Sequence, residues 1–450
     1  MSDTPGSNPG PEDPQNPFKG TPFEGLFGPG PFPGGLPGMP AGVPDLSHLL
    51  GQIQSLMQPY DGPLNWDVAL DTARKAAATT PDPTPSQKQK DAVADAVRLA
   101  DHWLEETTAF PSGIATATAW SKAEWLVETA PVWKQLVEPI AESSVSSLSG
   151  ALPPEMAAMA GPVAGFLGKA VGALLASQTG SGLGALAGDV LSLSDVGIPL
   201  AAPGRAALLP VNITPFAEGL GIGEDDVLLY LALREAAHQR LFAGVPWLRE
   251  HLIGAVRDYA AGVEINLEAI QERVEEQVQG IDMSDPASLQ QLLENGMFEL
   301  PKTPQQRAAL ERLEIALALV EGWVDEVVAM ATAERMPAAT KLQEAVRRRR
   351  AAGGPAEQVF ANLVGLELRP RRLRDASTLW GSLRTRQGVE ARDGVWMSPA
   401  LLPTSSDLDD PLGFREGAEQ PDALTDADFD AELRKLLDGG GASDDTSDAE

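Results

Sequence analysis

The sequence predicts a mainly α-helical protein with a small β-sheet, an α+β fold, between two disordered tails. Along most of the middle of the chain, apolar residues are spaced as in amphipathic helices, with helix-start residues in front of them. After residue 180, two short apolar stretches with Gly or Pro beside them predict strands. Both ends have the composition of unfolded chains, so the folded part is expected in between.

The tails are predicted from composition. Residues 1–44 carry Pro and Gly at short intervals and offer little apolar surface to offset the entropy of ordering. From residue 404 onward, 15 acidic residues stand against 3 basic ones, a local charge of 3 − 15 = −12. We therefore expect a disordered Pro/Gly-rich tail at 1–44, a single mostly helical domain at 45–403 and a disordered acidic tail at 404–450.

Helix signals follow one another through the domain. Asn65 precedes an amphipathic stretch, and Thr84-Pro85-Ser86 combines capping side chains with an early Pro. Acidic residues at 224–226 suit the positive N-terminal end of the next long helix. Helices are expected at 64–78, 84–107, 120–144, 154–177, 224–243, 245–261, 266–278, 286–294, 304–333, 337–351, 355–363 and 428–437.

The two predicted strands lie between these helices. Residues 189–193 and 207–213 are short, apolar and flanked by Gly or Pro. Pro210 lacks a backbone donor, so it would place the second strand at a sheet edge. Such an edge is one place where an extended peptide can pair.

The chain is strongly acidic. Its 34 basic and 64 acidic residues give a formal charge of −30, so no nucleic acid is expected as a partner. The basic cluster Arg347–Arg350 is expected to pair with acidic groups inside the protein, and further arginines at 369, 371, 372 and 374 continue it.

Cysteine and membrane signals are absent from the sequence. Without cysteine, disulfides and thiolate metal sites are excluded. Residues 156–176 approach the length of a membrane span, but Pro162, Lys169 and many small residues favour a closely packed buried helix pair. No basic segment followed by an apolar stretch opens the chain, so the expected location is cytoplasmic.

One expected helix, 224–243, carries a candidate metal motif. Arg234-Glu235-Ala236-Ala237-His238 places side chains of one helix close to a common point. A metallopeptidase uses this spacing with His, Glu and His: the imidazoles bind zinc and the Glu takes a proton from the metal-bound water. Arg234 has no lone pair to offer, so the first ligand of such a site has been replaced.

A second candidate segment lies on the helix expected at 304–333. Glu321-Gly322-Trp323-Val324-Asp325 supplies a carboxylate for the metal side, and Asp325 one turn later could orient the imidazole of His238. Glycine costs about 1 kcal/mol relative to Ala inside a helix. We expect close approach of the motif helix to explain Gly322.

These segments together resemble a known family. Residues 233–242, 245–248 and 321–325 are similar to the zincin-like metallopeptidase type 2 family. Residues 366–374 and 393–396 resemble its branch of actinobacterial proteins labelled hydrolases. The similarity spans roughly residues 60 to 413.

The resemblance implies a zinc hydrolase with named roles for these residues. Glu235 would be the general base, His238 and Glu321 metal ligands, and Asp325 a support behind them. A branch linked to deazaflavin-coenzyme biosynthesis keeps the full His-Glu-x-x-His pattern, from which this chain departs at Arg234.

Other metal arrangements are weaker on the sequence. The four histidines are His48, His102, His238 and His251, and His251 could complete a zinc site only if its helix folded back. A di-metal bundle needs Glu-x-x-His on two helices, and the sequence has one. Alternatively, the guanidinium of Arg234 replaces the metal electrostatically by pairing with Glu235 or Glu321.

Two functions therefore stay open. The chain is either a zinc-dependent hydrolase of this family with impaired activity, or a non-catalytic binding or scaffold protein that uses the old active-site cleft and its flexible tails. A peptide or protein is the expected partner. Trp247, Trp323, Trp380 and Trp396 are expected to be core anchors rather than ligand platforms.

Overall fold

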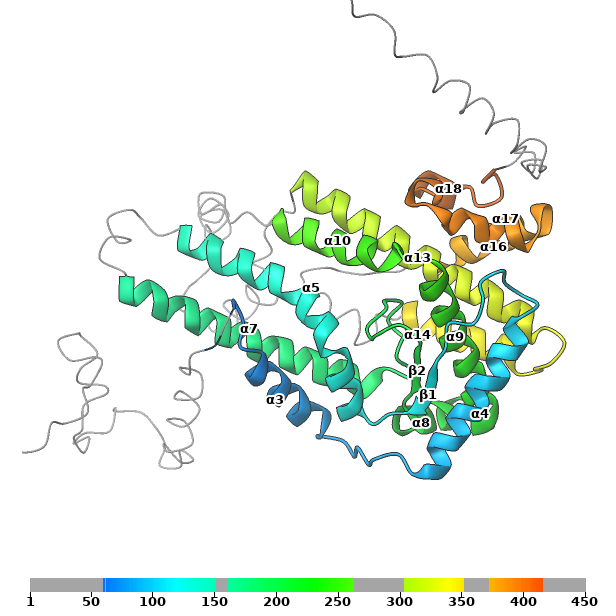
Figure 1. Cartoon of the computed structure of the whole chain (residues 1–450), viewed down its shortest axis with the longest axis horizontal. Helices are drawn as coiled ribbons and strands as arrows, with labels where there is room; N and C mark the ends of the chain where they lie inside the picture. The colour runs from blue at the N-terminus through cyan, green and yellow to red at the C-terminus, as the bar shows by residue number, and fades with distance from the viewer. Residues whose placement is uncertain (1–59, 61, 151–160, 263–302, 352–371, 416–450) are drawn as a thin grey trace, which may run out of the picture. The chain divides into compact units, whose positions relative to one another are not determined.

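The structure, a computed structural model, describes residues 60, 62–150, 161–262, 303–351 and 372–415. These residues are mainly helical with one two-stranded sheet, as the sequence predicts (Figure 1). The helices of eight or more residues are α3 (Trp66–Ala77), α4 (Gln87–Leu104), α5 (Lys122–Gly150), α7 (Gly161–Asp189), α8 (Pro210–Leu220), α9 (Glu224–Gly244), α10 (Leu248–Ala261), α13 (Pro304–Thr332), α14 (Ala339–Ala351) and α16 (Leu373–Gln387).

Shorter helical segments complete the C-terminal part. They are α17 (Val389–Gly394), the 3-10 turns η1 (Val395–Met397) and η2 (Pro399–Leu401), and α18 (Ser405–Asp409). Leu408 of α18 is buried, and α18 packs against α16. Ordered packing thus continues past residue 403, where the acidic tail is expected to begin.

Several sequence predictions fall outside the described residues. These are the tail at 1–44, the acidic residues after 415, the helices at 266–278, 286–294, 355–363 and 428–437, and residues 369 and 371. The helix α16 was not predicted. Its bounds enclose three arginines and small polar residues, which obscure the apolar face that Leu379, Trp380 and Leu383 bury.

The predicted helix starts are found close to their capping residues. Asn65 accepts a hydrogen bond from the backbone of Val68 at 3.2 Å. Ser86 forms a capping box with Gln89 at the start of α4. Thr303 does the same with Gln306 at the start of α13, where Pro304 occupies the first turn. Capping thus begins the helices that carry and surround the site.

The long glycine-rich helix α7 packs closely on α3. A Cβ added at Gly180 would lie 2.3 Å from the Ala69 carbonyl oxygen, and one at Gly184 would lie 2.5 Å from the Ala76 Cβ. The two glycines, which follow the segment 156–176 where close helix packing was expected, therefore allow α7 and α3 to approach. No helix among the described residues is long and apolar enough to cross a membrane.

The sheet differs from the one predicted. Strand β1 (Thr116–Ala119) pairs in parallel with β2 (Arg205–Leu208), with Thr116 opposite Arg205 and Ala119 opposite Leu208. The segment expected as a strand at 189–193 contributes one antiparallel bridge between Ser192 and Leu208. The strand β1, with the sequence Thr-Ala-Thr-Ala, was missed because it carries no apolar stretch.

Pro210 is the clearest correction. It was expected at the edge of a strand covering 207–213, but β2 ends at Leu208 and Pro210 is the first residue of α8. Proline favours this first helical position because its fixed backbone angle suits a helix and its missing donor has no helical partner there. The predicted peptide-pairing edge at 208–213 is therefore mostly helix.

Two helices form the centre of the packing. Helix α9 contacts α4, α8, α13 and β2, and α13 contacts α10 and α16 (Figure 1). Trp323 of α13, Trp380 of α16 and Trp396 are buried, and Trp247 is partly buried and stacks on Trp396, which confirms these tryptophans as core anchors.

Gly322 has a different neighbour from the one expected. A Cβ at this position would lie 2.5 Å from the Ala376 Cβ and 2.7 Å from the Ser377 nitrogen, both in α16. The glycine therefore allows α13 to approach α16 rather than the motif helix α9. The sequence shows the need for close packing there, but the partner depends on how distant helices assemble.

Candidate functional site

The motif lies in the buried part of α9. Every residue from Tyr230 to Leu241 is buried, so the helix passes through the protein interior. Arg234 is 4% exposed, Glu235 0% and His238 1%. Burial of three ionisable side chains on one helix requires that each find a partner.

Glu321 of α13 joins Arg234 and His238. The Nη2 atom of Arg234 lies 2.6 Å from Glu321 Oε2, and His238 Nε2 lies 3.0 Å from Glu321 Oε1. Glu321 is itself 1% exposed. The three residues that the sequence places at a metal site thus meet, but as a hydrogen-bonded ion cluster.

A second arginine completes this cluster from α14. Arg350 Nη1 lies 2.9 Å from Glu321 Oε1, so Glu321 faces two guanidinium groups. Arg349, next to it, pairs with Asp189 and Asp195 at 2.8 Å each. These contacts confirm the internal pairing expected for the basic cluster, although the sequence did not indicate that Arg350 reaches the motif.

The sequence suggested that Asp325 orients the imidazole of His238, but in the structure the two residues have other partners. The His238 Nδ1 atom is 2.8 Å from the Arg234 carbonyl oxygen, and its other ring nitrogen faces Glu321. Asp325 Oδ2 instead accepts hydrogen bonds from Gln343, Arg347 and Ser377. Its Oδ1 atom lies 3.8 Å from Arg234 Nη1. Asp325 therefore belongs to the packing of α13 against α14 and α16.

Glu235 has hydrogen-bond partners different from those of Glu321. Its Oε2 atom accepts a hydrogen bond from the Ser194 backbone at 2.9 Å, and its Oε1 atom accepts from the Ser194 hydroxyl at 3.2 Å and from Gln239 Nε2 at 3.0 Å. Adjacent helix positions do not share a face, which separates Glu235 from Arg234. The partners Ser194 and Gln239 were not indicated by the sequence.

The segment 192–204 covers the cluster. Gly197 has φ +78°, and a Cβ at this position would lie 2.8 Å from Glu321 Oε1. A side chain there would have to displace an oxygen that His238 and Arg350 contact. Position 197 therefore requires glycine for two reasons: the positive φ of its backbone and the lack of space for a Cβ.

The surroundings of Glu321 and Glu235 shift the pKa values of these two acids in opposite directions. Burial alone would raise the pKa of Glu321, but Arg350 and His238, with a smaller contribution from Arg234, lower it to about 2. Burial raises the pKa of Glu235 above its usual value, against the lowering effects of His238 and the hydrogen bonds of Ser194 and Gln239. The charged form of Glu321 is thus stabilised, whereas the charged form of Glu235 is destabilised.

The chain is similar to known proteins over the residues that form this site. The profile of the zincin-like metallopeptidases matches residues 64–414, which include both α9 and α13. The chain belongs to the zincin-like metallopeptidase family. A solved structure described as "a putative hydrolase with a novel fold from Chloroflexus aurantiacus" is similar at 20% identity and a TM-score of 0.57, over 79% of this chain and 100% of that one. No protein of curated function matches.

Because zincin-like metallopeptidases bind zinc, the residues around Glu321 must be compared with the ligands that zinc requires. Zinc needs lone pairs from several side chains, and the guanidinium of Arg234 offers none. Both oxygens of Glu321 already face cationic or donor groups. Among the described residues, no group of three or more His, Cys, Asp or Glu side chains is arranged to hold a metal ion. The residues present do not fit a zinc ion.

His251 does not supply the missing ligand. It lies on α10, where its ring packs edge-on against Trp247 with ring centroids 5.5 Å apart. Burial lowers its pKa, with Arg312 adding to this effect. The helix of His251 therefore does not fold back to bring this histidine to the cluster around Glu321.

Proposed function

We propose that this zincin-like protein keeps the two helices of a metallopeptidase site but has lost zinc-dependent hydrolysis, and that it acts by binding a peptide or another small partner. The observation that carries this proposal is the 2.6 Å contact between Arg234 Nη2 and Glu321 Oε2. It puts a fixed positive charge against the carboxylate that the family resemblance assigns to the metal.

The charges of the cluster support the same proposal. Arg234 and Arg350 together supply the positive charge that a divalent cation would bring to Glu321. A buried carboxylate left without its cation would be costly, so the arginines also explain why Glu321 persists at this position. The backbone at Gly197 approaches Glu321 so closely that an added Cβ would lie 2.8 Å from its Oε1 atom, which restricts the space beside this carboxylate.

The second candidate is a zinc-dependent hydrolase of the family. Family membership and the description of the similar solved structure favour it. It would use Glu235 as general base, with His238 and Glu321 as ligands. The contacts of Glu235 with Ser194 and Gln239 argue against this role, because both oxygens of its carboxylate already accept hydrogen bonds within the protein.

The sequence-based expectations on organisation accompany this proposal. We propose a single domain between the two tails, a cytoplasmic location, and a contribution of the Pro/Gly-rich and acidic tails to partner contacts. The boundaries at 44 and 403 are part of that proposal.

Metal analysis of the purified full-length chain tests the loss of zinc. We expect less than a tenth of a zinc ion per chain in the unaltered protein, roughly the level of adventitious binding, because the guanidinium groups occupy the site. The double variant R234H/R350M removes both cations and adds an imidazole, so it is expected to gain zinc. Peptide hydrolysis is measured on the same samples.

Two further variants identify where any zinc binds. One zinc ion per chain in the unaltered protein, lost in His238→Ala and kept in His251→Ala, would overturn the proposal. His251 is the matched control because it is a half-buried histidine that does not contact the cluster. Zinc-dependent hydrolysis that is lost in Glu235→Gln would establish the second candidate instead.

A further inference from the structure

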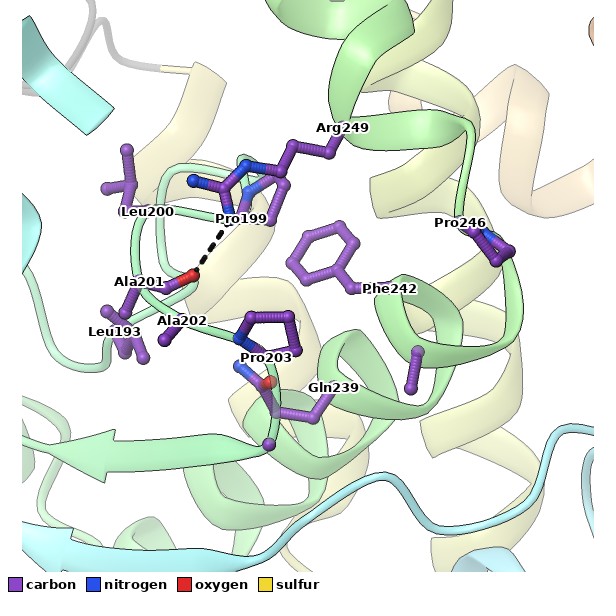
Figure 2. Close-up of a pocket in the computed structure, with 12 residues that line it drawn as sticks. Leu193, Pro199, Leu200, Ala201, Ala202, Pro203, Gln239, Phe242, Pro246 and Arg249 are labelled. Carbon is purple, nitrogen blue, oxygen red and sulfur yellow. Dashed lines mark hydrogen bonds between the residues drawn. The ribbon is translucent and has the colours of Figure 1, made fainter. Parts of the chain in front are cut away.

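A pocket lies between segment 192–204 and the C-terminal half of α9. Its walls come from Pro199–Gly204, from Gln239 and Phe242 of α9, and from Pro246 and Arg249 after that helix (Figure 2). The cavity measures about 240 Å³. Three prolines line it, and proline restricts the backbone, so its shape is largely formed in advance.

The lining of the pocket is apolar except at two places. Phe242 lies between Arg249 on one side and Gln239 on the other (Figure 2). The amide nitrogen of Gln239 is already used by Ser194 and Glu235. The group in the pocket that is left to recognise a ligand is therefore the guanidinium of Arg249.

Arg249 has no carboxylate partner among the residues that the structure describes. Within the described part of the chain it makes one hydrogen bond, from Nη1 to the Ala201 carbonyl oxygen at 3.2 Å, which holds the side chain across the pocket (Figure 2). The contrast with the paired arginines 234, 349 and 350 is clear, since each of those faces an acid. A guanidinium carries five N–H donors in a fork that matches a carboxylate, so most of its capacity here is unused.

We propose that this pocket binds an apolar carboxylate, with the carboxylate on Arg249 and the apolar group against Phe242 and the prolines. A water molecule takes up about 30 Å³, so the cavity has room for roughly eight non-hydrogen atoms. A branched chain of five or six carbons with a carboxylate has about this size. The same chemistry occurs in a free short-chain acid and in the C-terminal leucine of a peptide.

The charge of the chain gives Arg249 its selectivity. With a formal charge of −30, the protein repels anions in general. A carboxylate therefore binds only where a local cation faces it at short range, and an uncharged analogue of the same shape lacks this contact. The pocket adjoins the cluster, because Gln239 donates to Glu235 and the ring of Phe242 lies 5.7 Å from that of His238. The inference still stands apart from the zinc test, since its assay measures carboxylate binding through Arg249 and not metal content.

Binding of 4-methylpentanoate to the full-length protein tests the proposal. Its affinity is measured by ligand-observed NMR beside the neutral 4-methylpentanamide, which has the same shape. We expect the carboxylate to bind at least tenfold more tightly than the amide. A peptide ending in a free leucine carboxylate, compared with its amidated form, tells whether the pocket prefers a chain terminus to a free acid.

Variants tie the binding to the pocket. Arg249→Met keeps length and removes charge, and we expect it to lower the carboxylate affinity at least tenfold. Arg257→Met is the matched control, because Arg257 is exposed on the same helix and does not line the pocket. Ala202→Trp fills the cavity from an exposed position and should abolish binding without unfolding the chain.

The outcomes separate clearly. Equal affinities for the carboxylate and the amide, or binding that survives both Arg249→Met and Ala202→Trp, would overturn the proposal. Loss of binding in Arg257→Met to the same degree as in Arg249→Met would do so too, since it would point to general charge. Circular dichroism of each variant confirms that the fold is kept.

Discussion

Helix α13 carries two buried ion clusters, about one and a half turns apart, that differ in how completely they are hydrogen bonded. The first joins Glu321 to Arg234, Arg350 and His238. The second joins Glu326 to Arg392, which also pairs with Asp393. Both place carboxylates and guanidinium groups in the core, so the comparison holds burial and chemistry nearly constant.

The second cluster uses its polar atoms fully. Arg392 donates to Asp393 at 2.8 Å, to Glu326 at 2.5 Å and to the Thr107 carbonyl oxygen at 2.7 Å. Asp393 in turn accepts from Thr108 and Trp323. These contacts tie α17 to α13 and to the segment after α4. Such a network is what a purely structural ion pair requires.

In the described part of the chain, the first cluster leaves several buried polar atoms without a hydrogen bond, although two of them, Arg234 Nη1 and Asp325 Oδ1, lie 3.8 Å apart as an ion pair. Arg234 Nη1, Arg350 Nε, Asp325 Oδ1 and the Tyr230 hydroxyl make no hydrogen bond within the described residues. The first cluster is therefore less completely hydrogen bonded than the second.

The largest expected effect comes from the fully bonded cluster. Arg392→Met leaves Glu326 and Asp393 buried without their main cation, so we expect the free energy of unfolding to fall by about 3–5 kcal/mol. Arg384→Met is the control, because Arg384 pairs with the same Glu326 but is 32% exposed, and we expect about 1 kcal/mol or less. Urea unfolding measures both, and similar losses would break the comparison.

Acid titration sharpens the contrast inside the first cluster. Because the pKa of Glu321 is lowered to about 2, its carboxylate stabilises the fold above the unfolded pKa, and this stability is lost as the pH falls from about 4.5 to 2. Glu321→Gln should therefore destabilise the protein by about 3 kcal/mol at pH 7 and by much less at pH 2.

Glu235→Gln is the matched variant with the opposite sign. The pKa of Glu235 is raised by burial, so its contribution to stability is present at low pH and is lost as the pH rises through the folded pKa. Removing the ionisable group should make the variant more stable relative to the unaltered protein as the pH rises. Parallel pH profiles for the two variants would contradict the assignment.

The cover over the first cluster gives a smaller effect. Gly197→Ala combines a left-handed backbone with a Cβ 2.8 Å from an oxygen of Glu321 that Arg350 and His238 hold, and we expect a loss of about 2–3 kcal/mol. Gly221→Ala also has positive φ but open space around the new Cβ, so about 1 kcal/mol is expected. Thermal unfolding distinguishes them, and equal losses would mean that Glu321 moves freely.

The smallest effect tests the unpaired atoms. Tyr230→Phe removes a buried hydroxyl without a hydrogen bond, so stability should change by less than about 0.5 kcal/mol. In the second cluster, Thr108→Val removes a 2.7 Å hydrogen bond to Asp393 and should cost about 1–3 kcal/mol. A large loss in Tyr230→Phe would show that the first cluster is as fully bonded as the second.

Local signals explain what the sequence could predict. The start of α13 follows from Thr303 and Pro304, and α9 follows from acidic residues before a long apolar pattern. The meeting of Arg234, His238 and Glu321 was predictable because the family resemblance joins two segments that are far apart in the sequence. Spacing within one helix could not have shown it.

The missed features depend on tertiary contacts. Arg350 reaches Glu321 only because α14 returns to the motif helix, and no spacing in the sequence records that path. Ser194 reaches Glu235 from a loop whose position β2 determines. Pro210 was misassigned because proline favours both strand edges and helix starts, and only the packing of α8 decides between them.

The double pairing of Glu321 makes its charge compensation redundant. Its two guanidinium partners come from separate helices, α9 and α14. Loss of either arginine leaves the other against the carboxylate, so no single arginine substitution leaves Glu321 buried without a cation. One buried side chain of α13 thus connects two helices that are far apart in the sequence.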